Sequence, residues 1–166
     1  MNELQETIKK ILADAKGILA ADEGFPTIKK RFAKIGLAST EETRRSYREV
    51  LITTPEIERY ISGVILFDET IRQKAQDGRP FVEILAGRGI IPGIKVDQGT
   101  ELAPGTQDEK VTKGLEGLEA RLAEYKALGA RFSKWRAVYS IGEGTPSDAI
   151  IERNAEGLVQ YALASQ

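Results

Sequence analysis

The sequence predicts an α/β protein whose strands form a parallel sheet. Four short apolar runs recur along the chain, and charged residues or glycines follow them. Segments with apolar residues at helical spacing lie between these runs, and one further helix precedes the first run. Strands that alternate with helices in this way favour a parallel sheet with right-handed crossovers.

The four predicted strands share a continuous apolar character. The first run, Gly-Ile-Leu-Ala-Ala, ends at Asp22, and the second ends at Asp68. Short runs that are apolar throughout are typical of strands buried on both faces. The predicted strands lie near residues 17–22, 63–67, 90–96 and 131–138.

The predicted helices begin with one from Asn2 to Lys16, where Gly17 is expected to act as the C-terminal stop. Ser39 and Glu42 have the spacing of a capping box at the start of another helix. The most loop-like stretch, residues 103–113, is interpreted as an excursion between a strand and a helix. The remaining helices are expected at residues 26–35, 41–51, 80–86, 115–128 and 147–164, and the whole chain, 1–166, is expected to form a single unit.

The composition excludes several classes of chemistry. The 166 residues include 24 Lys and Arg against 25 Asp and Glu, with neither histidine nor cysteine. A net charge of −1 gives no global field that would collect nucleic acid or anionic lipid. Catalytic triads, disulfides and Cys/His zinc sites are excluded. Proton transfer would use Lys, Asp, Glu or Tyr. With no apolar signal core and no spanning segment, the sequence predicts a cytoplasmic protein without a membrane partner.

Charged residues gather where the predicted strands end, the edge at which parallel α/β folds bind ligands. Asp22 and Glu23 follow the first strand, and Asp68 follows the second. The simpler interpretation of these acidic pairs is that loops are polar. Lys95 and Lys134 differ because each lies inside a strand-like run, where a lysine must be buried or face a lumen. We interpret the two lysines as part of a site, with structural ion pairing as the alternative.

The spacing of Lys134 and Arg136 sharpens this interpretation. Side chains two residues apart in a strand point to the same face, so Trp135 would point to the helices. With Lys95, these residues would form a cationic cluster suited to phosphate or carboxylate groups. Crowded positive charges also favour a neutral lysine amine that can attack a carbonyl. The sequence contains no phosphate-loop or dinucleotide-binding motif.

Several segments resemble the N-terminal half of class I fructose-1,6-bisphosphate aldolases. The two most specific are Gly-Ile-Lys-Val-Asp and Phe-Ser-Lys-Trp-Arg. The matches run from the first helix to the end of the chain, at residues 17–23, 30–32, 63–67, 77–81, 93–97 and 132–136. The resemblance implies part of a (β/α)₈ barrel and a glycolytic lyase that cleaves a sugar bisphosphate through a lysine Schiff base, without a metal or other cofactor.

The resemblance also implies roles for individual residues. Asp22, Lys95 and Lys134 match the family's catalytic aspartate and the lysines of its third and fourth strands. A second group matches positions that bind the sugar phosphate or lie beside such positions: Glu23, Thr27, Arg31 and Arg136. The chain departs from the family at residues 24–26, where Gly-Phe-Pro replaces the usual Ser-Thr-Gly.

The 166 residues contain no match to the family's fifth-strand glutamate or to its sixth-strand Schiff-base lysine. We therefore expect a (β/α)₄ half of a TIM-type barrel with a leading helix, completed by dimerisation across its first and fourth strands. Three functions stay open: a sugar-phosphate site with lysine chemistry, a catalytically silent half-barrel that forms a homodimer, and a module that binds small anions without turnover.

Overall fold

The computed structural model describes residues 2–166, and Met1 lies outside the described residues. The described chain forms two compact units. Unit 1 runs up to Lys95 and also includes Tyr125–Ser133. Unit 2 comprises Val96–Glu124 and Lys134–Gln166. The expectation of one unit over residues 1–166 stays a prediction.

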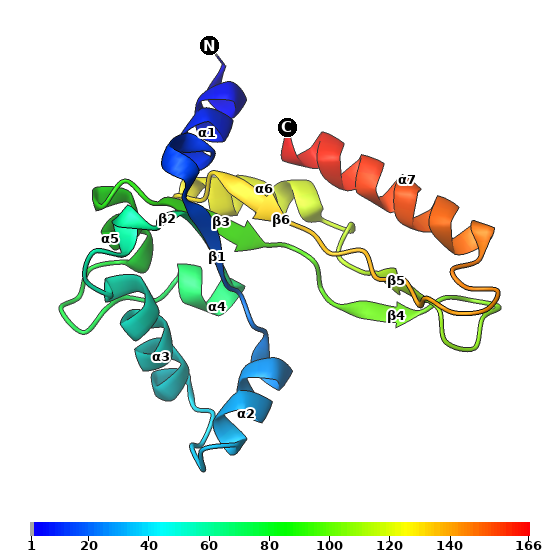
Figure 1. The fold of residues 1–166 in the computed structure, drawn as a ribbon, viewed down its shortest axis with the longest axis horizontal. Helices are drawn as coiled ribbons and strands as arrows, with labels where there is room; N and C mark the ends of the chain where they lie inside the picture. Colours follow the sequence, from blue (N-terminus) through cyan, green and yellow to red (C-terminus); the bar gives the residue numbers. More distant parts are fainter. Residues whose placement is uncertain (1) are drawn as a thin grey trace. The chain divides into compact units, whose positions relative to one another are not determined.

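The elements alternate as the sequence predicts (Figure 1). The helices are α1 (Glu3–Ile11), α2 (Phe25–Ala33), α3 (Glu41–Thr53), α4 (Asp68–Ile71), α5 (Phe81–Gly87), α6 (Leu118–Ala127) and α7 (Asp148–Ser165), with 3₁₀ turns η1 (Ala13–Ala15) and η2 (Ile57–Arg59). The strands are β1 (Gly17–Ala21), β2 (Ile61–Leu66), β3 (Ile91–Lys95), β4 (Thr100–Leu102), β5 (Lys110–Thr112) and β6 (Phe132–Lys134).

An α/β fold with a parallel sheet is confirmed. The main sheet has the order β1-β2-β3-β6, and β1 and β3 both pair with β2 in parallel. Ala21 of β1 lies opposite Leu66 of β2, which in turn lies opposite Ile94 of β3. These three side chains are at most 1% exposed, so they mark the packed face of the sheet.

The opposite face of the sheet, which we call the open face, carries the alternate residues. In β1 these are Ile18, which is 47% exposed, and Ala20, which is also exposed. The ring of Phe132 covers Gly63 and Gly93 on this face. A Cβ atom at Gly93 would overlap this ring, so only glycine fits beneath it. The open face is therefore covered at β2 and β3 within unit 1 and exposed at β1.

Two expectations from the sequence are wrong in detail. The first helix ends at Ile11 and is followed by the turn η1, so Gly17 begins a strand instead of stopping a helix. The cap of α3 is Thr40, which exchanges hydrogen bonds with Thr43, and not the pair Ser39 and Glu42. A threonine at the third helical position supplies the returning bond that glutamate gives in the common capping box.

The prediction of burial on both faces holds for β3. In β2 it holds in part, because Ile61 and Ile65 are half-buried, and it is wrong for β1 and for β6, whose three residues are all half-buried. In β1, only Ala21 is fully buried. The cause is position in the sheet, because β1 is an outer strand with one paired neighbour, β2. The apolar side chains of an outer strand such as β1 stay exposed where no element of the same unit packs on them.

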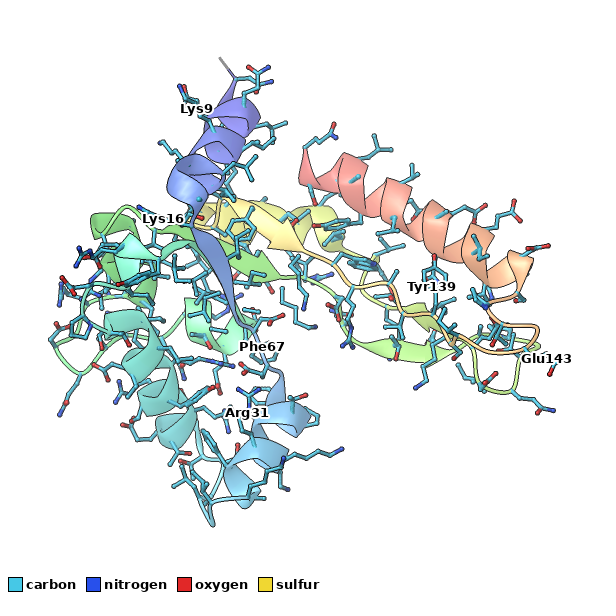
Figure 2. The ribbon with its side chains drawn as sticks, viewed as in Figure 1. Lys9, Lys16, Arg31, Phe67, Tyr139 and Glu143 are labelled. Atoms are coloured by element: carbon cyan, nitrogen blue, oxygen red, sulfur yellow. The ribbon has the colours of Figure 1, made fainter. Side chains whose placement is uncertain are left out.

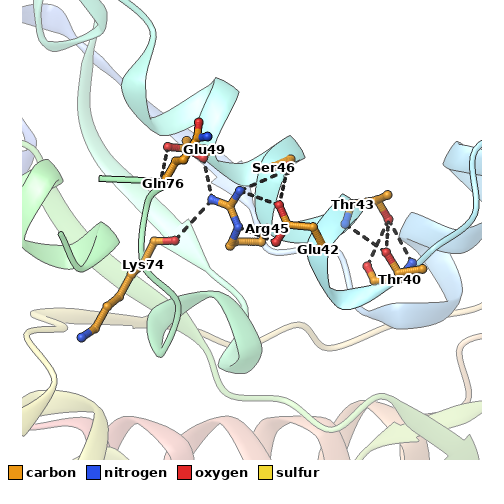
Figure 3. Close-up of polar contacts among 8 residues, drawn as sticks. All are labelled: Thr40, Glu42, Thr43, Arg45, Ser46, Glu49, Lys74 and Gln76. Atoms are coloured by element: carbon orange, nitrogen blue, oxygen red, sulfur yellow. Dashed lines mark hydrogen bonds and ion pairs between the residues drawn. The ribbon is translucent and has the colours of Figure 1, made fainter. Parts of the chain in front are cut away.

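Arg45 links α3 to the segment that follows α4 (Figure 3). Its guanidinium donates to Glu42 at 2.7 and 2.8 Å, to Glu49 at 2.5 Å, and to the carbonyl of Lys74 at 3.4 Å. Glu49 also accepts the backbone N–H of Gln76 at 2.8 Å. These bonds fix the start of the 74–80 loop against the helix.

Unit 2 contains a hairpin that the sequence did not predict. Strand β4 directly precedes the stretch interpreted as a loop, residues 103–113, and pairs antiparallel with β5, which lies inside that stretch. In the connection between β4 and β5, the buried Glu109 accepts hydrogen bonds from the backbone and side chain of Ser147, both at 2.7 Å. These bonds hold Ser147, the residue before the first turn of α7, and Trp135 stacks on Tyr161 of that helix with ring centroids 5.4 Å apart. The expected packing of Trp135 against a helix is confirmed.

Candidate functional site

Asp22 and Lys95 lie at one level of the unit 1 sheet. Ala21, Leu66 and Ile94 form one row across β1, β2 and β3, and Asp22, Phe67 and Lys95 are the residues that follow them. Within β3, alternation places Lys95 on the open face, whereas Asp22 and Phe67 come directly after the last residues of β1 and β2. Two strand spacings put the Cα atoms of Asp22 and Lys95 roughly 10 Å apart. Asp22 is 7% exposed, and Lys95 is half-buried. One polar ligand at this end of the sheet could meet both side chains.

Glu23 is held by two arginines from neighbouring helices. Arg48 of α3 donates to Glu23 Oε2 and also to the Glu23 backbone carbonyl, at 3.0 Å. Arg31 of α2 donates to Glu23 Oε1 and, at 2.8 Å, to the hydroxyl of Tyr47. The exposed fractions of the side chains are 3% for Arg48, 13% for Glu23 and 51% for Arg31.

The electrostatics of this cluster keep the Glu23 carboxylate ionised. Burial acts to raise the pKa of Glu23, but it is outweighed by the hydrogen bond from Arg48, a backbone hydrogen bond and the charges of Arg48 and Arg31. The pKa of Glu23 therefore lies below its ordinary value. The hydrogen bond to Tyr47 and the charge of Glu23 raise the pKa of Arg31. Both partners are fully charged near neutral pH.

The Gly-Phe-Pro departure forms an aromatic contact. Phe25, at the start of α2, packs edge-on against Phe67 after β2, with ring centroids 5.2 Å apart. The guanidinium of Arg44 lies 4.7 Å from the centre of the Phe25 ring and pairs with Glu69 at 2.5 and 2.7 Å. Figure 2 places Phe67 and Arg31 in this part of unit 1. The bulky replacement thus ties α2 to the end of β2.

The other predicted site residues lie as follows. Thr27 is exposed in the first turn of α2, where its N–H bonds to the Gly24 carbonyl at 3.0 Å. Lys134 ends β6, and its carbonyl accepts the Val96 N–H at 3.1 Å. Arg136 is exposed and follows the strand, and its carbonyl accepts a bond from Thr112 at 2.7 Å. Because β6 ends at Lys134, strand alternation no longer places Arg136 on the same face as Lys134.

The structure brings Asp22, Glu23, Thr27, Arg31 and Lys95 into unit 1, whereas Lys134 and Arg136 belong to unit 2. A common site for all seven residues stays a prediction. Among residues 2–166, the structure contains no group of three or more acidic side chains placed to hold a metal ion. No described helix is long and apolar enough to span a membrane.

Sequence reasoning missed Arg48 and Tyr47. The signal for Arg48 was its position four residues before Ile52, because residues at this spacing share one face of a helix and Ile52 is fully buried. An arginine on the apolar face of a helix needs an acidic partner, and Glu23 is the partner that the fold supplies.

The parallel main sheet and the helices between its strands define the chain as an α/β protein. Comparison with known proteins then gives the family. The family model for class I fructose-bisphosphate aldolase matches residues 3–166. The chain therefore belongs to the class I fructose-bisphosphate aldolase family.

Individual relatives agree with this assignment. A probable class 1 fructose-bisphosphate aldolase from Xanthomonas campestris pv. campestris is 56% identical over 166 residues, which cover all of this chain and 50% of the relative. Cytosolic fructose-bisphosphate aldolase 5 from Arabidopsis thaliana is 52% identical over 99% of this chain and 46% of its own length. The solved structure of a Plasmodium falciparum fructose-bisphosphate aldolase superposes with a TM-score of 0.95 at 49% identity, over 98% of this chain and 47% of that one. The chain thus spans about half the length of the relatives it matches.

Proposed function

We propose that this chain forms the N-terminal part of the substrate site of a class I fructose-bisphosphate aldolase, as a (β/α)₄ half of an eight-stranded barrel that acts in glycolysis. The observation that carries the proposal is that Asp22 and Lys95 follow the row Ala21, Leu66 and Ile94 at the carboxyl end of the sheet, with Lys95 on its open face. In a barrel this face would line the interior, and the residues at its carboxyl end would meet the ligand.

The proposal gives separate roles to the charged groups. Lys95 and Lys134 act on the sugar backbone with Asp22, and Arg136 and Thr27 bind phosphate oxygens. The proposal includes no metal or organic cofactor, because the family's chemistry proceeds through a Schiff base on a lysine amine. In the family, the Schiff base forms on a lysine of the sixth strand, and the strands of this sheet match those that precede it. We therefore assign ligand binding to these residues and expect turnover from a complete barrel.

Calorimetric titration with fructose-1,6-bisphosphate tests the proposal. Lys95→Met removes one charge from the open face and should weaken binding at least tenfold. Lys9→Met, on α1, is the matched control and should leave the affinity within twofold. Equal affinities for the two variants would remove Lys95 from the site, and no binding by the unaltered chain would overturn the proposal.

A second candidate function is self-association, which the exposure of β1 favours. An outer strand with Ile18 47% exposed offers both an edge and an apolar surface to a second copy. A homodimer would pair its β1 with the partner's β6 and close eight strands. Light scattering should then give about twice the 18.3 kDa chain mass. Ile18→Glu should restore the monomer and Val50→Glu, on the exposed face of α3, should not. A single 18.3 kDa species from the unaltered chain would contradict this candidate.

We place the protein in the cytoplasm, with the sugar phosphate as its small-molecule partner and with neither nucleic acid nor membrane as a partner. The likeness to an aldolase of Arabidopsis that is named as cytosolic supports this placement. Fractionation of the source cells tests it, and recovery of the protein with the membrane pellet would contradict it.

A further inference from the structure

We infer that Arg48 is a positioning residue, which fixes the segment after β1 through Glu23, and that the Glu23 carboxylate serves this purpose instead of contacting substrate. The inference deepens the proposed function and rests on it, because Asp22 of the proposed site precedes Glu23 directly. It replaces the substrate-binding role that the family resemblance implies for Glu23.

The first argument is the burial of Arg48. Its side chain is 3% exposed, yet it carries a permanent charge. Removing one partner from a buried ion pair is strongly destabilising, because the other charge is left uncompensated. Glu23 is therefore required where it is, and a carboxylate that neutralises a buried arginine cannot leave it to bind a ligand.

The second argument is that Arg48 holds the backbone as well as the side chain. One nitrogen of its guanidinium donates to the carboxylate and the other to the carbonyl of Glu23, at 3.0 Å. The carbonyl bond fixes the peptide plane two residues after β1 ends. Asp22 lies between that plane and the last residue of the strand, so its main chain is held from both sides.

The third argument is that the remaining carboxylate oxygen is also occupied. Arg31 donates to Glu23 Oε1 and is itself held by the Tyr47 hydroxyl at 2.8 Å. The cluster thus joins α2, α3 and the end of β1. Each oxygen of the Glu23 carboxylate accepts from one guanidinium group, and an ionised carboxylate by itself would repel a phosphate group. Both observations favour an internal role for Glu23.

Hydrogen–deuterium exchange on the full chain tests the positioning role without depending on activity. In Arg48→Gln, the amides of residues 22–28 should exchange at least tenfold faster, while those of β3 keep their rates. The control is Arg45→Gln, on the same helix and with two carboxylate partners of its own (Figure 3). It should leave residues 22–28 unchanged and accelerate Gln76, whose N–H bonds to Glu49.

Ligand binding supplies the second readout, with fructose-1,6-bisphosphate as the probe. Arg48→Gln should raise the Kd at least tenfold and Arg45→Gln less than twofold. Arg48→Lys should give intermediate values of both readouts, because an ammonium can pair with the carboxylate but lacks the fork that also reaches the carbonyl. This variant also serves as the test if Arg48→Gln does not fold.

Three results would overturn the inference. Unchanged exchange at residues 22–28 in the Arg48 variants would show that Arg48 does not hold the segment. Equal acceleration in β3 would show a general loss of stability. Weaker binding by Glu23→Gln with normal exchange at residues 22–28 would show direct contact with the ligand. If the unaltered chain binds no fructose-1,6-bisphosphate, the proposed function fails, and the exchange rates alone decide whether Arg48 positions the segment.

Discussion

Strands β1 and β3 pair with the same neighbour and have similarly apolar sequences, yet they are buried to different extents. Ile91 of β3 is 9% exposed and Ile18 of β1 is 47% exposed, although both lie on the open face in one row, on either side of Gly63. Composition cannot explain this difference. The central strand has neighbours on both edges and the Phe132 ring over Gly93, whereas β1 is an outer strand of the sheet. Burial is therefore a property of the position in the sheet, and an outer strand shows its apolar surface until a partner covers it.

This difference matters for the proposed site because both strands contribute to it. Lys95 stands on a strand that is fixed by packing, and Asp22 stands just after one that is not. The segment after β1 needs another source of order, and the bonds from Arg48 to Glu23 provide it. Packing thus fixes the position of Lys95, and charge-assisted hydrogen bonds to the neighbouring Glu23 fix that of Asp22.

The largest effect is expected where the central strand tolerates no side chain. Gly93→Ala would drive a Cβ atom into the Phe132 ring. Overpacking combined with displacement of a packed aromatic ring should cost about 4 kcal/mol. Urea denaturation followed by circular dichroism measures the loss. Gly87→Ala is the control, because a Cβ there would meet open space, and it should be neutral or slightly stabilising. Similar midpoints for the two variants would contradict the packing of Phe132 on Gly93.

The next effect compares matched isoleucines in the two strands. Ile91→Ala should lower the free energy of unfolding by about 3 kcal/mol, since it empties a buried position in the same row and on the same face as Ile18. Ile18→Ala should lower it by less than about 1 kcal/mol in the monomer, because half of that side chain is already in water. A loss at Ile18 as large as that at Ile91 would mean that β1 is covered, and the measurement would then be repeated at lower protein concentration to detect a dimer.

Much of the fold follows from local signals, and the exceptions have physical causes. Apolar runs and glycines were enough to place a strand at each position of the main sheet, although β6 covers Phe132–Lys134 and not the predicted 131–138. Strand position was not predictable, so the exposure of β1 was missed. The hairpin of β4 and β5 was missed because three-residue strands leave no clear alternation. At the site, Asp22 and Lys95 were found from strand ends, whereas Arg48 was hidden within a helical pattern and depends on a contact 25 residues away.

A smaller effect concerns acid stability at the end of β1. The pKa of Glu23 is lower in the folded chain than its ordinary value of 4.5, so the ionised carboxylate stabilises the fold. This contribution is complete above about pH 4.5 and is lost as the pH falls through the lowered pKa. The difference in unfolding free energy between the unaltered chain and Glu23→Gln should be largest at pH 7 and shrink below pH 4.5. A pH-independent difference would contradict the ion pair with Arg48.

The smallest effect is expected at Glu42, whose ion pair with Arg45 is exposed to solvent, unlike the pair of Glu23 with Arg48. Hydrogen bonds from Arg45 and Ser46 lower the pKa of Glu42 to about 2. The same sign applies as for Glu23: any stabilisation is present above the ordinary pKa and is lost as the pH falls towards 2. Solvent screens this pair, so Glu42→Gln should leave the melting temperature unchanged within error at pH 7. Carboxyl ¹³C NMR should still detect the low pKa. A large loss of stability on Glu42→Gln would show that an exposed ion pair on α3 also stabilises the fold. The expected difference between the exposed Arg45–Glu42 pair and the buried Arg48–Glu23 pair would then be wrong.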